Sequence, residues 1–160
     1  MKNPCPVCDL HRSQCAQDQY EIARNPLWLL RHHPEPSPLA GWLLLDSRRH
    51  LAGPQAFTVA EASSWGSLVQ ASCELVLALT GCDRVYTIAF GEGAHHLHLH
   101  LIPRRQSDPE TCAWSVADLY RAVNNGLKPP ADHGQIMELV HRARTLVADN
   151  FSALPEQNNI

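Results

Sequence analysis

The sequence lacks the features that define several classes of protein. Its longest apolar runs, such as residues 42–45, fall far short of the roughly 20 residues that span a bilayer. A Cys-Pro pair and Asp9 occupy the place where a signal peptide needs an apolar stretch. No block of basic residues stands out at a formal net charge of −3, so broad binding to nucleic acid or to a membrane surface gains no support. We therefore predict a cytoplasmic protein that is not exported.

The chain does contain enough apolar material for one folded domain. It has 160 residues, of which 44% are hydrophobic and 18% are charged. A globular chain of this length buries roughly 70% of the surface that its unfolded form exposes. We expect a single domain over residues 1–160 that needs no disulfide framework, although six cysteines are present.

The hydrophobic pattern predicts four strands and three helices. The strands are residues 27–30, 42–46, 85–90 and 95–102, and the helices are residues 58–80, 116–123 and 136–147. A proline-rich turn joins the first two strands into a hairpin, and Pro103 is predicted to end the last strand. In the longest helix Thr58 and Glu61 fit a capping box, and Gly81 fits the C-cap. The short connections favour an antiparallel α+β sheet over βαβ units.

Histidine is the outlier in the composition. The chain has ten histidines, and four of them lie between positions 95 and 100. Read with a period of two, His96, His98 and His100 point to one face of a strand, about 7 Å apart in succession, while the leucines between them enter the core. His95 falls on the leucine face. Packing alone has no use for three imidazoles in a row, so this row indicates chemistry.

Two kinds of chemistry use such a row. Three imidazoles can bind one catalytic metal ion, although alternate residues of a straight strand converge poorly on a single ion. In the other interpretation the row is a phosphate site. A neutral imidazole attacks phosphorus, and a protonated neighbour supplies positive charge where negative charge develops.

Cys5 and Cys8 form a second candidate site near the N-terminus. Cysteines separated by two residues are typical of half a zinc site. A thioredoxin-like redox motif has the same spacing but needs a preceding strand, and only four residues precede Cys5. Metal binding is therefore the favoured interpretation.

The histidine row and its surroundings resemble the signature of the histidine triad (HIT) family. Residues 96–102 alternate histidine with apolar residues, and Pro103-Arg104 follows them. Residues 41–50 are similar to the family's Gly-His, apolar strand and basic-x-His segment, and the cysteine pair is similar to its zinc-binding branch. The resemblance covers about residues 5–105 and implies an antiparallel HIT-like sheet with one long helix, followed by a C-terminal helical extension over about residues 106–155.

The resemblance assigns a role to each histidine of the triad. His98 is the nucleophile that attacks the α-phosphate of a nucleotide and forms a covalent nucleotidyl-histidine, which water then hydrolyses. His100 contacts phosphoryl oxygens and assists the leaving group. Its retention as histidine favours hydrolysis over transfer to a sugar phosphate. His96 either supports the site by hydrogen bonds or joins the zinc ligands.

The zinc-binding branch also implies a set of metal ligands. A closed site with two sulfur and two nitrogen ligands suits structural zinc. The residues nominated are Cys5, Cys8, His50 and His96. Such a site ties the N-terminal arm to the catalytic strand and positions His98 indirectly. The alternative is a local zinc knuckle that uses His11 or Cys15.

The expected contacts to the substrate phosphate come from the segment around the triad. Residues 90–96 form a loop about four residues shorter than the family's, without its Gln, Ser or Thr. The backbone of Gly93, the side chains of His95 and Arg104, and His100 are the predicted substrate-binding groups.

The predicted function is nucleotide phosphohydrolysis at the α-phosphate. Dinucleoside polyphosphates such as diadenosine tetraphosphate are plausible substrates, with nucleoside phosphoramidates and adenylylated adducts as alternatives. The shortened loop motivates a different prediction, a nucleotide-binding module with weak or lost catalysis. HIT proteins are commonly homodimers, so the resemblance also implies a homodimer.

Overall fold

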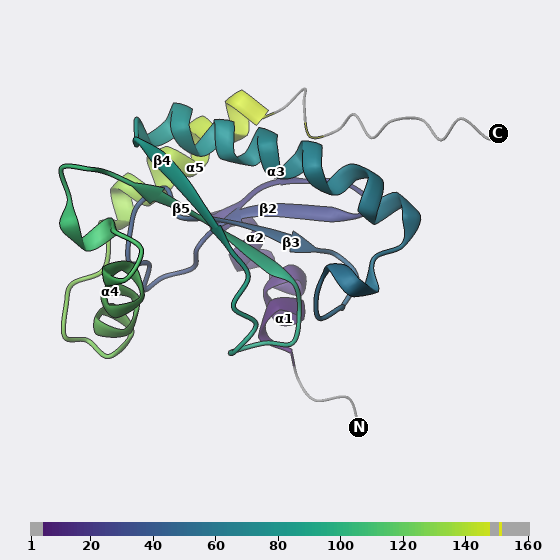
Figure 1. Cartoon of the computed structure of the whole chain (residues 1–160), viewed down its shortest axis with the longest axis horizontal. Coiled ribbons are helices and arrows are strands. Elements are labelled where there is room, and N and C mark those ends of the chain that lie inside the picture. Colours follow the sequence, from purple (N-terminus) through teal and green to yellow (C-terminus); the bar gives the residue numbers. More distant parts are fainter. Residues whose placement is uncertain (1–4, 148–150, 152–160) are drawn as a thin grey trace.

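A five-stranded antiparallel sheet with the order β1-β2-β3-β5-β4 organises the part of the chain that the computed structural model describes, residues 5–147 and 151 (Figure 1). The strands are β1 (Glu21–Arg24), β2 (Trp28–His32), β3 (Leu43–Ser47), β4 (Arg84–Ile88) and β5 (His98–Arg104). The helices are α1 (Pro6–Arg12), α2 (Gln14–Tyr20), α3 (Val59–Thr80), α4 (Ser115–Asn124) and α5 (His133–Val147), with short 3-10 turns at Pro54–Ala56 and Pro109–Thr111. The predicted α+β class and antiparallel sheet are confirmed.

The hairpin and the long helix form where the sequence predicts them. β2 pairs with β3 in antiparallel register, with Leu30 opposite Leu45. Thr58 caps α3 by accepting a hydrogen bond from the backbone of Glu61, whose side chain accepts one in return from the backbone of Thr58. Gly81 ends the helix at a φ of 60°, in the left-handed region that glycine adopts without a steric penalty.

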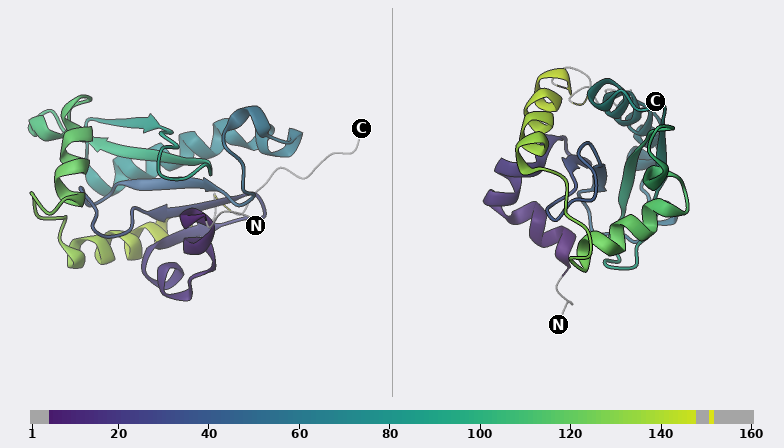
Figure 2. Two further views of the ribbon diagram at one scale, coloured as in Figure 1. Left: turned by 90° about the horizontal axis from the view of Figure 1, so that it is seen from below. Right: turned by 90° about the vertical axis from the view of Figure 1, so that its left-hand side faces the viewer.

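The sheet has one face packed into the core and another that builds the site. Alternate residues of β2, β3 and β5, such as Leu30, Leu45 and Leu99, pack against α3 and α5. Figure 1 shows α3 running along this side of the sheet and α1 on the other. α4 packs on the second face, where Val116 meets Trp42 and Ile102. In the two views of Figure 2, α4 stands at one end of the sheet and α1 at a distance from it, so that the two helices flank the second face.

The C-terminal part of the chain belongs to the same core. Three residues of α5, namely Ile136, Val140 and Ala143, are fully buried against the sheet and α3. Residues 148–150 and 152–155 of the expected extension lie outside the described part of the chain. No helix among the described residues is long and apolar enough to cross a membrane.

The last strand differs from the prediction at both ends. β5 begins at His98, three residues later than expected, because the N–H of Leu97 donates to the carbonyl of Leu51 and not to β3, although the carbonyl of Leu97 still accepts from Ser47 of β3. β5 also continues through Pro103 to Arg104. The missing N–H of a proline costs little there, since β3 extends only to the position opposite Leu101 and leaves that edge without a partner strand.

The N-terminal region contains structure that the hydrophobic pattern does not predict. Residues expected to be irregular or weakly helical form α1 and α2, with Ser13 as the N-cap of the second helix. The short strand β1 then pairs with β2 at the sheet's other edge. α1 places Cys5 and Cys8 beside the chain that precedes β5.

Candidate active site and metal centre

The strand register brings four functional side chains to one face of the sheet. Arg31 of β2 lies opposite Leu44 of β3, which lies opposite His100 of β5. Asp46 lies opposite His98 in the adjoining row. Directly opposed residues of an antiparallel pair share a face, as do residues two apart on one strand. Arg31, Asp46, His98 and His100 therefore face the same side, the side away from α3.

A cleft of about 610 Å³ lies over this face. Its walls are mainly apolar, with aromatic rings from Phe90, Trp42 and Tyr120, and its polar side chains include Arg31, His98 and His100. An apolar cleft with a few convergent polar groups suits a small organic ligand with an anionic part.

His98 is held in the form that a nucleophile needs. Its Nδ1 lies 2.5 Å from the carbonyl oxygen of His96, and because a carbonyl only accepts, Nδ1 carries the proton. The lone pair is then on Nε2. The ring is half-buried and lines the cleft, so Nε2 is available to an electrophile.

His100 is held in the opposite tautomer. The indole Nε1–H of Trp42 donates to Nδ1 of His100 at 3.0 Å, so the proton of a neutral His100 is on Nε2. Burial, followed by the nearby His98, His33 and Arg31, lowers the pKa of His100 to about 3. The prediction that a protonated histidine stands beside the nucleophile therefore does not hold for His100. His100 is instead a neutral hydrogen-bond donor. Its ring centroid lies 5.2 Å from that of His98.

His96 does not line the cleft with the other two histidines. It precedes β5, and its ring is buried against the N-terminal cysteines instead of facing the cleft. The predicted alternation holds, because Leu97, Leu99 and Leu101 all lie in the hydrophobic core, and α1, whose cysteines contact His96, lies on the side of the sheet away from α3. Within the described residues, no cluster with metal-binding geometry includes His98 or His100, so the structure gives no support to a catalytic metal on the triad.

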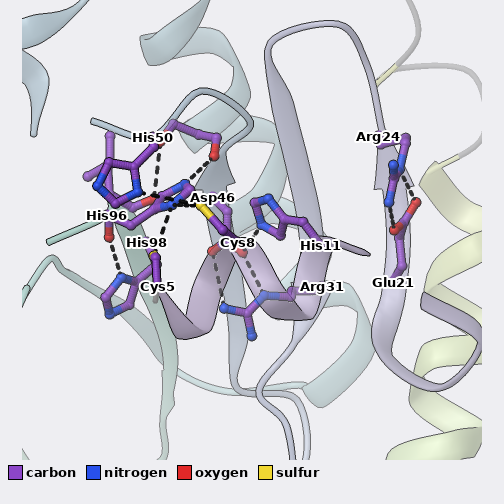
Figure 3. A network of polar contacts seen from close by, with 12 residues as sticks. Cys5, Cys8, His11, Glu21, Arg24, Arg31, Asp46, His50, His96 and His98 are labelled. Atoms are coloured by element: carbon purple, nitrogen blue, oxygen red, sulfur yellow. Dashed lines mark hydrogen bonds and ion pairs between the residues drawn. The ribbon is translucent and has the colours of Figure 1, made fainter. Parts of the chain in front are cut away.

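Cys5, Cys8, His50 and His96 come together from three distant segments (Figure 3). Their ligand atoms all lie within 4.8 Å of one another. Nδ1 of His96 lies 3.6 Å from Sγ of Cys5 and 3.4 Å from Sγ of Cys8, and Nδ1 of His50 lies 3.4 Å from Sγ of Cys8. Tetrahedral zinc with Zn–S bonds of about 2.3 Å and Zn–N bonds of about 2.0 Å separates sulfur from nitrogen by about 3.5 Å. The four residues therefore fit a structural zinc ion.

The surroundings of His96 suit a metal ligand. Its Nε2–H donates to the carbonyl oxygen of Ser47 at 2.6 Å, which leaves the lone pair on Nδ1, the nitrogen that faces the cysteines. Burial lowers the pKa of this imidazole, so it stays neutral. The local knuckle is not formed, because His11 instead pairs with Asp46 at 2.9 Å and Cys15 is exposed.

The predicted substrate-binding residues separate into two groups. Gly93 and His100 line the cleft. His95 is exposed and is not among the lining residues. Arg104 lies at the far end of β5, where its guanidinium binds Thr111 and nearby carbonyl groups instead of facing the cleft. The positions of these two side chains do not support a role in binding.

Arg31 and Asp46 are site residues that sequence reasoning missed. Nε and Nη2 of Arg31 lie 2.6 and 3.4 Å from the two carboxylate oxygens of Asp46, and both residues are buried (Figure 3). Burial by itself raises the pKa of Asp46, but the charge of Arg31 and the hydrogen bonds from His11 and Arg31 bring it below its usual value. The sequence does contain a signal for Arg31, since Leu29, Arg31 and His33 alternate as the residues of one strand face do. It was missed because the predicted strand stopped at residue 30.

Comparisons with known proteins identify the fold. No protein-family model and no curated protein matches the chain. Among solved structures, a Zn-bound histidine triad family protein from Mycobacterium smegmatis superposes with a TM-score of 0.64 at 14% identity, over 90% of this chain and 95% of that one. A Hit-like protein from Bartonella henselae gives 0.62 at 15% identity, over 91% and 98%. Plasmodium falciparum diadenosine triphosphate hydrolase gives 0.58 at 14% identity, over 82% and 78%.

These likenesses show that the chain has the fold of the histidine triad proteins. The agreement in fold extends over most of each compared chain, although the sequences have diverged to a low level of identity.

Proposed function

We propose that the chain is a nucleotide phosphohydrolase that cleaves its substrate at the α-phosphate through a covalent intermediate on His98. The observation that supports this most directly is the pair of opposed tautomers in the cleft. His98 offers a lone pair on Nε2, and His100 offers an N–H on its own Nε2. A nucleophile beside a hydrogen-bond donor is the arrangement that phosphoryl transfer needs.

The reaction proceeds in two displacements. In the first, Nε2 of His98 forms a bond to the α-phosphorus as the bridging bond to the leaving group breaks, and the leaving group departs with the bonding electrons. The carbonyl of His96 stabilises the imidazolium that forms, because it already accepts the Nδ1–H of His98. The Nε2–H of His100 donates to an oxygen at the reacting phosphorus. In the second displacement water attacks phosphorus, the P–N bond breaks, and the proton of the water passes to solvent.

The cleft supports a nucleotide as the substrate class. Its apolar walls and the rings of Phe90 and Tyr120 suit a planar base, whereas Arg31, His98 and His100 line it from the strands of the sheet. One compared protein is named a diadenosine triphosphate hydrolase, so diadenosine polyphosphates are the first substrates to test. Nucleoside phosphoramidates are the second, because the same displacement breaks a P–N bond.

We propose that zinc, held by the two cysteines with His50 and His96, has a structural role. When bound, zinc supplies a rigid crosslink and no reactive group, since its four ligands leave no open position. The metal cluster would influence the reaction through His96. Its ring belongs to the cluster and its carbonyl orients His98, so the cluster fixes the nucleophile.

The proposal is tested by mass spectrometry of the intact protein after brief mixing with diadenosine tetraphosphate. The expected result is a mass increase equal to one adenylyl group, mapped to His98, together with steady release of AMP. His98→Gly should abolish the adduct and lower turnover by about 10³-fold or more. His141→Ala, which removes an exposed histidine of α5, is the matched control and should leave both unchanged. Unchanged turnover in His98→Gly would reject the proposed nucleophile.

A second candidate function is a nucleotide-binding module with little catalysis. Two observations favour it: residues 90–96 contain no Gln, Ser or Thr side chain, and His100 is too buried to gain a charge. Tight binding of AMP with neither adduct nor turnover across the substrate panel would establish this function in place of the first. Homodimer formation and cytoplasmic location stay predictions.

A further inference from the structure

Arg31 has one nitrogen that its ion pair with Asp46 does not use. Nε and Nη2 face the carboxylate, whereas Nη1 is buried and has no hydrogen-bond partner among the described residues. Figure 3 shows this third nitrogen turned away from Asp46. A buried N–H group without a partner destabilises the folded protein, and more so when the group is charged. An acceptor that enters the cleft removes this destabilisation.

The position of Arg31 places its side chain in the same cleft as the reacting groups. Arg31 is 5% exposed and is among the residues that line the cleft with His98 and His100. It shares a row with His100 across β3, so the two backbones lie two strand spacings apart, about 9–10 Å. The guanidinium of Arg31 reaches Asp46 of β3, the strand between them, and Asp46 lies opposite His98. A ligand that contacts Arg31 and His100 must therefore span only a few ångströms.

We propose that Arg31 is the anion-binding residue of the cleft and that its Nη1 donates to a phosphoryl oxygen of the ligand. A guanidinium matches phosphate oxygens better than an ammonium does, because its N–H groups are fixed in one plane. Asp46 holds that plane in place from the other side. The identity of the ligand as a nucleotide rests on the proposed function, whereas its anionic character rests on Arg31 itself.

The test compares AMP with adenosine, which differ only in the phosphate. Isothermal titration of the full chain should show that AMP binds more tightly than adenosine. Arg31→Lys keeps a cation to pair with Asp46 but lacks the second branch of the fork. It should weaken AMP binding at least tenfold and change adenosine binding by less than twofold. Arg24→Lys is the matched control. Arg24 also pairs with a carboxylate, that of Glu21, but both residues belong to β1, which is adjacent to β2 and lies outside the cleft. This variant should change neither.

A second variant covers the case in which a single substitution at Arg31 prevents folding. Arg31→Gln combined with Asp46→Asn replaces the buried ion pair with two neutral amides, so that neither residue leaves an unpaired buried charge. This double variant should lose the preference for AMP over adenosine while its unfolding remains cooperative. Equal weakening of AMP and adenosine in either variant would show that Arg31 only maintains the fold, and would overturn the inference.

The outcomes also separate this inference from the proposed function. If wild-type protein binds AMP no more tightly than adenosine, the anion site is rejected even when an adduct forms on His98. If the preference for AMP depends on Arg31 but no adduct or turnover is found, the hydrolase proposal is rejected and the anion site stands. Inorganic phosphate is titrated in parallel, and it should compete with AMP in wild-type protein but not in Arg31→Lys.

Discussion

The indole of Trp42 determines which nitrogen of His100 carries a proton. Its Nε1–H donates to Nδ1 of His100 at 3.0 Å, and both rings are buried. An indole can only donate, so this contact excludes a proton on Nδ1 and leaves Nε2–H pointing to other partners. Trp42 stands where HIT proteins have the histidine of their Gly-His pair, so a residue that departs from the family pattern acts directly on the triad.

Trp42→Phe should release this constraint with little change in volume. His100 is then free to take either tautomer, and we expect kcat for nucleotide hydrolysis to fall about tenfold, as suits the loss of one donor to the reacting phosphate. The ¹⁵N shifts of labelled histidine should show Nδ1 of His100 gaining protonation. Trp65→Phe is the control, because Trp65 packs against Trp28 in the core without touching a histidine. Unaltered ¹⁵N shifts in Trp42→Phe would contradict the assignment.

The metal cluster predicts that zinc content and thermal stability depend on Cys8. Cys8→Ser removes the sulfur that lies 3.4 Å from both His50 and His96. We expect zinc content, measured by mass spectrometry of the metal, to fall from about one ion per chain to well below that. The thermal midpoint should also fall, because the bound metal stabilises the folded state alone. Adduct formation on His98 should slow as well, since the carbonyl of His96 orients it.

Cys15→Ser is the control for the metal prediction. Cys15 is exposed and lies outside the cluster, so its variant should keep the zinc and the wild-type midpoint. Full zinc content in Cys8→Ser, or equal loss in both variants, would show that the four residues are not the binding site.

Local patterns predicted the long helix and the hairpin because each depends on residues close in sequence. The cap of α3 needs only Thr58 and Glu61, which are three residues apart, and the helix has both hydrogen bonds of the capping box. The resemblance supplied the long-range part. It nominated His50 and His96 as partners of the cysteines, which no spacing rule could have joined, since Cys8 and His50 are 42 positions apart.

The remaining site residues depend on register, which the sequence does not display. Arg31 reaches the row of His100 only because β2 and β5 both pair with β3 at Leu44. The place of His96 in the metal cluster likewise depends on tertiary structure. A period of two places the three histidines on the face opposite the core leucines, but it does not show that His96 meets the cysteines of α1 whereas His98 and His100 line the cleft.

Glu61 connects the start of α3 to the loop that carries His50. Its carboxylate accepts hydrogen bonds from the backbone of Thr58 and from two nitrogens of Arg49, and it is 2% exposed. Glu61→Ala should lower the free energy of unfolding by about 1–3 kcal/mol, measured in urea, because the donors lose their acceptor. It should also weaken zinc binding, since Arg49 is adjacent to His50. Glu74→Ala, at an exposed position of the same helix, should do neither.

The hydrogen bonds of Glu61 also have a signature in pH. The pKa of Glu61 lies below its usual value of 4.5, mainly because Arg49 donates hydrogen bonds to the carboxylate. Burial opposes this effect, and the hydrogen bonds from Thr58 add to it. A lowered carboxylate pKa contributes stability that is present above the unfolded pKa and is lost as pH falls. The difference in unfolding free energy between wild type and Glu61→Ala should therefore shrink below about pH 4.5. A difference that is constant from pH 7 to pH 3 would exclude a role for the charged form.

Three buried histidines make the fold sensitive to mild acid. Burial is the main cause that lowers the pKa of His32 to about 4 and those of His33 and His100 to about 3, from the usual 6.5. Between these values and 6.5 the unfolded chain binds more protons than the folded chain, so stability rises with pH across that window. Each histidine should lower the free energy of unfolding by roughly 2 kcal/mol between pH 7 and pH 5.

His33→Gln isolates one of these contributions. The zinc ligands also gain protons in acid and add to the slope in every variant, so the informative quantity is the difference from wild type. His33→Gln should be less stable than wild type at pH 7, because the Nδ1–H of His33 donates to the carbonyl of Pro34 at 2.7 Å. It should lose less stability than wild type between pH 7 and pH 5, so the two urea midpoints converge. His141→Gln, at an exposed position, should parallel wild type throughout. Parallel curves for His33→Gln would mean that His33 is protonated in the folded protein, contrary to its burial.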